Sequence, residues 1–500
     1  MAFIKRYFNQ ILLSLGIFAA YFATRLYNIS SLPMFTDEAI YTRWSQIARF
    51  DANWRFISLT DGKQPSFVWL NMTIMRVVSD PLLSGRLVSV ASGFFAIIGI
   101  YLLAQEIFKN HRAGLIAAIL YIIYPFALVY DRMALYDSLL AAGMIWALYL
   151  QILLIRHKRL DIALILGMVL GFGVLTKSSA FFAIYLIPFS FILSNFRNEK
   201  IREIAKWVGL CLISVLMAYG FYSMLRLSPF FHIIGEKNSI FVYPFNEWFK
   251  HPFEFFLGNF NGLIDWFISY STIPMFLLIF ISFFLGGNKF LKEKLLLLIW
   301  FVLPLAALAL FGKVLYPRFI LFMTMPLLVL SAFSLNYILD LFKNNLIKTG
   351  VFLAFSLLML RSDFYILTDF ARAPIAKADT DQFVNAWPAG GGVKEIVSFF
   401  NEKTKSQKIY VATEGTFGSL PTYAMEIYLD ENKNIQKRGI WPLPREIPRD
   451  LVEKAATMKV YLVLNTTQVS PDNWPIKLVT RYQKGIGDSY MSLYEVTPNR

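Results

Sequence analysis

The chain has 500 residues, of which 57% are hydrophobic, 17% aromatic and only 16% charged. This balance excludes an ordinary soluble protein, because apolar runs of about 15 to 25 residues recur, long enough to cross a hydrocarbon core of about 30 Å. The net charge is +15, and the basic residues lie in short clusters between these runs. This distribution is better explained by the preference of Lys and Arg for cytoplasmic loops, and by attraction to anionic lipid headgroups, than by binding of nucleic acid. The single cysteine, Cys211, excludes an intrachain disulfide and a thiolate metal site.

The apolar runs predict a polytopic α-helical membrane protein with about 11 transmembrane helices. The first run follows a basic leader, but it has no small-residue cleavage site, so we expect an uncleaved first span. The spans are expected at about residues 9–29, 82–105, 113–130, 134–155, 160–176, 178–195, 205–226, 270–287, 294–311, 317–342 and 347–369.

Basic residues are unevenly divided between alternate loops. If the N-terminus is cytoplasmic, four basic residues fall in short outer turns: Arg132, Lys177, Lys313 and Arg318. Sixteen fall in inner clusters: Lys5, Arg6, Lys109, Arg112, Arg156, Lys158, Arg159, Arg197, Lys200, Arg202, Lys206, Lys289, Lys292, Lys294, Lys343 and Lys348. The preference of Lys and Arg for cytoplasmic loops therefore predicts this orientation.

This topology predicts two domains. Residues 1–369 form the membrane domain, with outer loops at 30–81 and 227–269, and residues 370–500 form a soluble extracytoplasmic α/β domain. In the latter, runs rich in β-branched and aromatic residues predict strands at 408–413, 459–465, 477–482 and 489–496. Helices are expected at 392–403 and 449–458. The aromatic loop 227–269 suits a segment lying in the membrane interface, as one re-entrant helix or two surface helices.

The outer stretch from Pro33 to Trp69 contains adjacent carboxylates, Asp37 and Glu38. Thr36 is the expected N-cap of a helix, which puts both acids in the first turn, where the macrodipole favours anions by about 0.3 to 1 kcal/mol. Asp37 should therefore stay ionised. Helical spacing aligns it with Tyr41, and then with Trp44 and Ala48. The alternative is that these acids only cap a juxtamembrane helix.

Further charged residues lie where two other spans begin. Asp131 and Asp137 flank Arg132 between the third and fourth spans, where a carboxylate needs water, a cation or a partner. Asp137, deeper in its helix, is the better functional candidate, and the alternative is a cap paired with Arg132.

Four cations are expected on the outer side, where they can neutralise a phosphate leaving group: Lys63, Lys177, Lys313 and Arg318. Singly, each could be a residue that snorkels to the interface. His232 and His251 lack a ligand spacing such as HxxxH, so the sequence leaves metal binding open.

At these residues the chain resembles the protein O-mannosyltransferase and lipid A aminoarabinose transferase families, membrane glycosyltransferases of the GT-C fold. The resemblance rests on an ordered set of short motifs. They are Asp37-Glu38 with Tyr41 and Ala48-Arg49, Trp54, the turn Gly62-Lys63-Gln64-Pro65 before Trp69, Arg132 with Asp137, Leu175-Thr176-Lys177, and Pro317-Arg318-Phe319 with Pro326. Gln64 and Ser66 depart from the usual residues around the family's KPP segment.

The resemblance implies roles for these residues. Asp37 would be the catalytic base, while Glu38 and Asp137 would order the acceptor, the sugar or a cation. Lys63 and Arg318, with Lys177, would bind the donor phosphate. The remaining substrate-binding candidates are Tyr41, Arg132 and Trp69.

The function expected is an inverting glycosyltransferase that moves a sugar from a polyprenyl-phosphate donor to a hydroxyl of a protein Ser/Thr, a lipid or a glycan. It would act at the outer face of the membrane among membrane lipids, with no certain cofactor and a divalent cation left open. One alternative is a transporter or flippase for a lipid-linked substrate, which would tend to have repeated halves and charges at mid-membrane. Another is a scaffold that displays the C-terminal domain.

Overall fold

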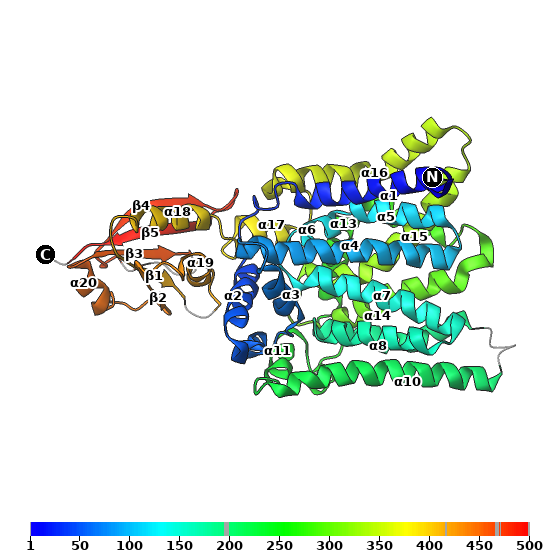
Figure 1. The fold of residues 1–500 in the computed structure, drawn as a ribbon, viewed down its shortest axis with the longest axis horizontal. Coiled ribbons are helices and arrows are strands. Elements are labelled where there is room, and N and C mark those ends of the chain that lie inside the picture. Colours follow the sequence, from blue (N-terminus) through cyan, green and yellow to red (C-terminus); the bar gives the residue numbers. More distant parts are fainter. Residues whose placement is uncertain (1, 195–199, 416–417, 466–469, 471, 499–500) are drawn as a thin grey trace.

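A helical bundle and a smaller sheet-containing domain lie end to end in this protein (Figure 1). The computed structural model describes residues 2–194, 200–415, 418–465, 470 and 472–498. Arg197, counted among the inner basic residues, lies outside them, as does the end of the span expected at 178–195. The predicted fold class, a polytopic helical membrane protein with a C-terminal α/β domain, is confirmed.

The bundle is built from the predicted apolar runs, each of which coincides with a helical stretch. Among the described residues, seven helical stretches are long and apolar enough to cross a membrane: α4 (Pro81–Phe108), α7 (Tyr136–His157), α10 with η5 (Ile201–Leu227), α13 (Phe256–Ser282), η6 with α14 (Gly287–Phe311), α15 (Leu321–Asp340) and α16 (Asn345–Thr368). Four runs form shorter apolar helices: the end of α1 (Ala2–Leu26), α5 (His111–Ile122), α8 (Leu160–Val174), and η3, α9 and η4 (Ser178–Leu193).

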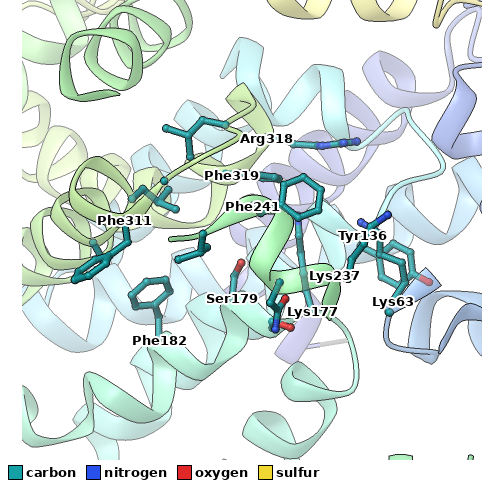
Figure 2. A pocket seen from close by; sticks show the side chains of 18 of the residues that line it. Lys63, Tyr136, Lys177, Ser179, Phe182, Lys237, Phe241, Phe311, Arg318 and Phe319 are labelled. Carbon is teal, nitrogen blue, oxygen red and sulfur yellow. The ribbon is translucent and has the colours of Figure 1, made fainter. Parts of the chain in front are cut away.

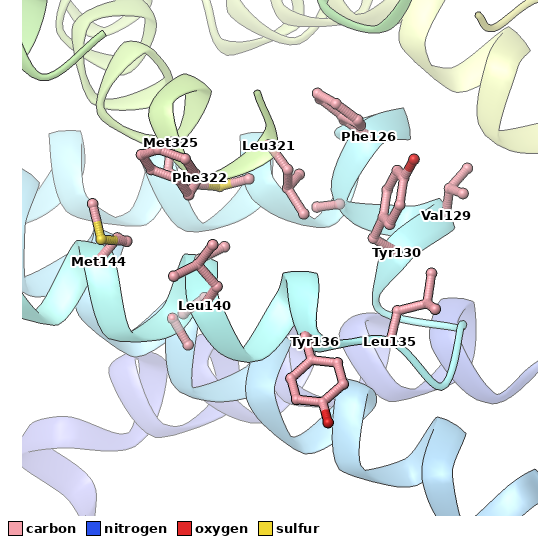
Figure 3. Packing of buried hydrophobic residues seen from close by; sticks show 14 of the residues in the cluster. Phe126, Val129, Tyr130, Leu135, Tyr136, Leu140, Met144, Leu321, Phe322 and Met325 are labelled. Carbon is pink, nitrogen blue, oxygen red and sulfur yellow. The ribbon is translucent and has the colours of Figure 1, made fainter. Parts of the chain in front are cut away.

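The core of the bundle surrounds α15, which is buried along most of its length. Leu321, Phe322 and Met325 of α15 face α7 and the short helix α6 (Pro125–Tyr130) (Figure 3). The run predicted as one span at 113–130 is divided into α5 and α6, because Pro125 lacks an N–H and disfavours helical backbone at the residue before it. Residues of α6 therefore reach the end of the bundle that faces the sheet domain.

The stretch from Pro33 to Trp69 folds at that same end of the bundle. It contains α2 (Thr36–Phe50), η1 (Ala52–Trp54), η2 (Ile57–Asp61) and the start of α3 (Ser66–Ile74). Thr36 was expected to cap α2, but the N-cap is Phe35, and the Thr36 hydroxyl instead donates to the Pro388 carbonyl, at 2.9 Å. The first-turn position of Asp37 is confirmed. Tyr41, Trp44 and Ala48 form the expected buried stripe.

The segment expected as a loop at 227–269 is mostly helical. It contains two short helices, α11 (Ile233–Phe241) and α12 (Phe245–Trp248), and α13 then begins at Phe256 instead of at residue 270. The polar residues Asn259, Asn261 and Asp265 concealed this extension, although they lie between apolar residues at helical spacing. The helix is kinked at Thr272, whose φ is 64°, two residues before Pro274.

The C-terminal domain contains a five-stranded sheet in the order β2-β1-β3-β5-β4. β1 (Ile409–Glu414) runs parallel to β2 (Ile435–Ile440) and β3 (Lys459–Leu464), whereas β5 (Tyr490–Val496) is antiparallel to β3 and to β4 (Ile476–Gln483). The four predicted strands are confirmed, as are α18 (Val393–Lys403) and α20 (Arg449–Ala455). The sequence missed β2, whose centre is polar, and α19 (Leu420–Leu429).

Residues 370–389, which we call the connecting segment, join α16 to the C-terminal domain. They contain η8 (Phe370–Arg372), α17 (Lys377–Thr380) and one turn of π-helix, η9 (Asp381–Asn385). Phe370 and Phe383 are buried against the bundle. A second contact lies between α19 and α2, where Arg43 forms ion pairs with Glu426 at 2.9 Å and Asp430 at 2.8 Å. The C-terminal domain is therefore attached to the bundle both through the connecting segment and through the contact of α19 with α2.

Candidate active site

A cavity of about 540 Å³ is lined by residues from the start of α7, the turn that follows α8, α11 and the end of α14. One part is apolar, and the other collects charged side chains contributed by segments far apart in the sequence (Figure 2). The apolar part includes Phe182, Phe241, Phe245, Ala307, Leu308, Phe311 and Leu315. The charged part includes Lys63, Asp137, Lys177, Lys237 and Arg318. Such a cavity is suited to an amphiphile with an anionic head.

Arg318 and Asp37 form an ion pair beside this cavity. The Arg318 Nη1 donates to Asp37 Oδ2 at 2.8 Å, and the guanidinium lies over the rings of Phe35 and Tyr316. Burial alone would raise the pKa of Asp37, but Arg318, Lys63 and Lys177 outweigh it and hold this pKa below its usual value. The Tyr41 hydroxyl also points at Asp37 Oδ2, at 3.4 Å. Asp37 is not itself among the residues that line the cavity, but its partners Arg318 and Tyr41 are, so it is an ionised carboxylate directly behind the cavity wall.

Lys177 and Asp137 form a second ion pair in the cavity wall. Lys177 Nζ donates to Asp137 Oδ1 at 2.7 Å, and the ammonium lies 4.8 Å from the centre of the Phe319 ring. Asp137 lies in the first turn of α7, and Lys177 lies in the turn between α8 and η3. Burial and Arg318 lower the pKa of Lys177, while Asp137 opposes that shift. This pair brings together two of the residues predicted from the sequence.

Lys63 differs from these cations, because no carboxylate of the described chain lies within 4 Å of its ammonium. Its Nζ lies 5.3 Å from the centre of the Phe241 ring. Burial, Arg318 and Lys177 together lower the pKa of Lys63 to about 8, although Asp37 and Asp61 partly oppose this. Among the described residues that line the cavity, Lys63 is therefore the cation without a counter-ion in direct contact.

Lys237 is a cavity residue that the sequence analysis missed. It projects from α11 and forms an ion pair with Asp61 at 2.6 Å, next to Gly62. Gly62 has a φ of 64°, and a Cβ there would lie 2.5 Å from the Lys237 Cβ. Only the presence of a lysine in an otherwise aromatic outer loop could have signalled this residue.

Glu38 does not reach the cavity, although it is adjacent to Asp37. It is fully buried, and its carboxylate forms a bidentate pair with Arg86, at 2.9 and 2.8 Å. It also accepts hydrogen bonds from the backbone N–H groups of Phe35 and Ala134. The contacts with Arg86 and Ala134 tie α2 to α4 and to the loop before α7, and the contact with Phe35 caps α2 itself. Glu38 therefore contacts protein groups and does not line the cavity, and its role in ordering the acceptor, the sugar or a cation stays a prediction.

Three other residues named from the sequence also lie outside the cavity lining. Asp131 is paired with Arg25, at 3.2 Å, and not with Arg132 as the alternative reading proposed. Arg132 is buried and donates from Nη2 to the Tyr27 carbonyl, and burial, Arg86 and Arg25 lower its pKa to about 10. Trp69 donates to the Arg55 carbonyl at 2.7 Å. Arg132 and Trp69 therefore contact the protein itself and do not face the cavity.

The described residues contain no cluster of three or more His, Cys, Asp and Glu side chains arranged to hold a metal ion. His232 is exposed, and His251 lies 3.4 Å from Glu254. Lys313, the fourth outer cation, lies over the ring of Tyr243 and is not among the residues that line the cavity. The charged part of the cavity is thus dominated by donors that suit an anion.

Comparison with known proteins supports the resemblance noted in the sequence. The family model described as dolichyl-phosphate-mannose-protein mannosyltransferase matches residues 63–221. The structure of ArnT from Cupriavidus metallidurans in the apo state is similar over 98% of this chain and 99% of that chain, with 13% identity and a TM-score of 0.58. The structure of the same protein bound to undecaprenyl phosphate is similar over 99% and 100%, with 12% identity and a TM-score of 0.61. No curated protein matches the sequence. The expected resemblance is confirmed: the chain matches the dolichyl-phosphate-mannose-protein mannosyltransferase family over residues 63–221, and it has the fold of ArnT over nearly its full length.

Proposed function

We propose that this protein is a membrane glycosyltransferase that takes a sugar from a polyprenyl-phosphate donor and transfers it to a hydroxyl group. The observation that carries the proposal is the cavity with an apolar part, a cationic part and an ionised carboxylate directly behind its wall. The family match and the ArnT fold support it, because one ArnT structure is described as bound to undecaprenyl phosphate.

In this proposal the apolar chain of the donor binds in the apolar part of the cavity, and its charged phosphodiester binds in the cationic part. Its polyprenyl chain lies along the aromatic side chains and α14, and its phosphodiester lies among Lys63, Arg318 and Lys177. Arg318 and Lys177 already face carboxylates, so Lys63 supplies the charge that a singly charged phosphodiester needs. Arginine also offers several N–H donors, so it can contact Asp37 and a phosphate oxygen together.

The proposed reaction is a single displacement with inversion at the anomeric carbon. The acceptor oxygen forms a bond to that carbon as the bond from carbon to the phosphate oxygen breaks, and the electron pair leaves with the polyprenyl phosphate. Asp37 takes the proton of the acceptor hydroxyl, and the cations stabilise the charge on the leaving phosphate. Asp137 keeps Lys177 charged and directed into the site.

We also propose the orientation predicted from the basic residues, with the cavity, the connecting segment and the sheet domain outside the cytoplasm. In this orientation the donor can reach the site from the outer leaflet. The acceptor is a hydroxyl of a protein Ser/Thr, a lipid or a glycan.

The test is transfer from a radiolabelled polyprenyl-phosphate sugar by the purified protein in detergent. Mannose, glucose, galactose and aminoarabinose donors are each combined with peptide and lipid acceptors, with and without a chelator. Product formation with inverted anomeric configuration by NMR supports the proposal. A retained configuration refutes the mechanism, and movement of an intact lipid-linked sugar across vesicles without transfer identifies a flippase instead.

A further inference from the structure

The connecting segment contains a buried carboxylate with no role in the reaction described above. Asp379 of α17 is only 1% exposed and accepts hydrogen bonds at Oδ2 from the hydroxyls of Tyr130, at 2.7 Å, and Tyr270. Tyr130 comes from α6, and Tyr270 lies in α13, just before the kink at Thr272. One carboxylate therefore anchors the connecting segment to two separate helices of the bundle.

The same segment holds the start of α2, where Asp37 lies. The Phe383 ring packs edge-on against Phe35, with centroids 5.0 Å apart, and the Arg318 guanidinium lies 5.7 Å from the centre of the Phe35 ring. The backbone N–H and the hydroxyl of Thr36 both donate to the Pro388 carbonyl, at 3.0 and 2.9 Å. Thus the two residues that precede Asp37 in the chain are both held by the connecting segment.

We propose that the connecting segment positions the catalytic base, and that Asp379 is the positioning residue that anchors this segment to the bundle. The inference rests on the proposed function, because Asp37 is the base only in that reaction. Asp379 does not line the cavity, so it acts through Phe35 and Thr36 and not by contact with substrate.

The charges around Asp379 give the anchor a dependence on pH. The groups that act on its carboxylate are Tyr130 from α6, Tyr270 from α13, Arg318 from η7 (Pro317–Phe319) and Asp137 from α7. Burial raises the pKa of Asp379 to about 6, although the two tyrosines and Arg318 act in the opposite direction. Because this pKa is above the value in the unfolded chain, the carboxyl stabilises the folded protein at low pH, and that contribution is lost as the pH rises through about 6.

The first experiment compares steady-state transfer by wild type, Asp379→Ala and Asp379→Asn. The alanine variant loses the acceptor of both tyrosine hydroxyls, so we expect kcat to fall about 10- to 100-fold, the effect of a small misplacement of a catalytic group. The donor KM should change less than threefold. An asparagine oxygen still accepts both hydrogen bonds, so Asp379→Asn should recover most of kcat. The control is Asp369→Ala, which removes a surface carboxylate of the preceding turn that contacts only Arg372 among described residues, at 3.1 Å.

Two further measurements keep the test decisive. If Asp379→Ala fails to fold, Tyr130→Phe tests the same contact, because it removes one hydroxyl donor and preserves the ring packing. Tyr130→Phe should lower kcat and leave the donor KM unchanged. The melting temperature of wild type in detergent should fall between about pH 4 and pH 6, the interval between the unfolded and folded pKa values of Asp379, and this step should be absent in Asp379→Asn. If wild type transfers sugar, and Tyr130→Phe and every Asp379 variant that folds have the same kcat as wild type, the positioning role of Asp379 is overturned while the proposed function stands. Absence of any transfer by wild type overturns the proposed function and the positioning role with it, while the melting step still reports on the anchor.

Discussion

Arg318 and Asp37 are joined by a 2.8 Å ion pair, although one precedes the last two membrane helices and the other follows the first. The pair fixes Asp37 as an ionised carboxylate and leaves other guanidinium N–H groups to face the cavity. The proposed base and a proposed phosphate ligand are therefore held together before substrate arrives.

Asp37→Asn should lower turnover by about 100-fold or more, because general base catalysis contributes roughly 10²- to 10⁴-fold. The substitution removes a negative charge beside Arg318, so undecaprenyl phosphate should bind at least as tightly as to wild type. Transfer kinetics and a binding titration with undecaprenyl phosphate check the two parts. Asp161→Asn, which changes an exposed carboxylate of α8, is the matched control. Equal turnover in wild type and Asp37→Asn would remove Asp37 from the role of base.

Lys63 should produce an alkaline limb in the pH profile of kcat/KM for the donor. The pKa of Lys63 in the free protein is lowered to about 8, so its ammonium loses a proton as the pH rises through this value and binds the phosphate less well. Lys63→Arg should move the limb beyond pH 10, because a guanidinium stays charged there. Lys405→Arg, at an exposed position of the sheet domain, should leave the limb near pH 8. A limb unchanged in Lys63→Arg would contradict the assignment.

Glu38→Gln should destabilise the protein rather than block its chemistry directly. It breaks the buried bidentate pair with Arg86, and removal of one partner of such a pair costs about 3 to 5 kcal/mol. Denaturation in detergent measures the loss. Glu38→Gln with Arg86→Met should recover part of it, because no unpaired buried cation remains. Normal stability with abolished turnover in Glu38→Gln would instead support contact with substrate.

Ala307→Trp should distinguish the lipid-binding part of the cavity from the phosphate-binding part. The indole fills space beside Phe311 and Leu308, so the KM for a long-chain polyprenyl donor should rise several-fold. For a water-soluble donor with a short chain, the KM of the variant should equal that of wild type. Val302→Trp, at a 42% exposed position of the same helix, is the control. The same loss with both donors would place the lipid chain elsewhere.

More of the fold than of the site could be predicted from the sequence. Long apolar runs specify membrane helices by composition alone, whereas the polar centre of β2 and the broken apolar pattern of α13 gave no such signal. Asp37 was singled out because it follows the first apolar run and falls in the first turn of an expected helix, and its role as base came from the resemblance. The partner of its neighbour Glu38 was not predicted, since adjacent residues on a helix point about 100° apart and face different partners. The buried Arg86 at the start of α4 was the missed clue, because an arginine there requires a carboxylate.

Asp379 was invisible to sequence reasoning for a different reason. It lies in a short polar stretch that resembles any linker, and its importance depends on two tyrosines contributed by distant helices. Lys237 was missed in the same way, because its loop was read by its aromatic content. Contacts between segments so far apart follow from packing and leave no local pattern.

The distance along the chain between the components of the site also determines when it can be completed during synthesis. At about 5 to 20 residues per second, the ribosome needs on the order of tens of seconds after Asp37 before it reaches Arg318, and longer before it reaches Pro388. Throughout that interval the carboxylate has no guanidinium beside it, and the start of α2 has no segment to hold it. A nascent chain that stalls before Arg318 therefore lacks part of the proposed centre, so under the proposed function the order of the chain itself prevents premature sugar transfer during membrane insertion.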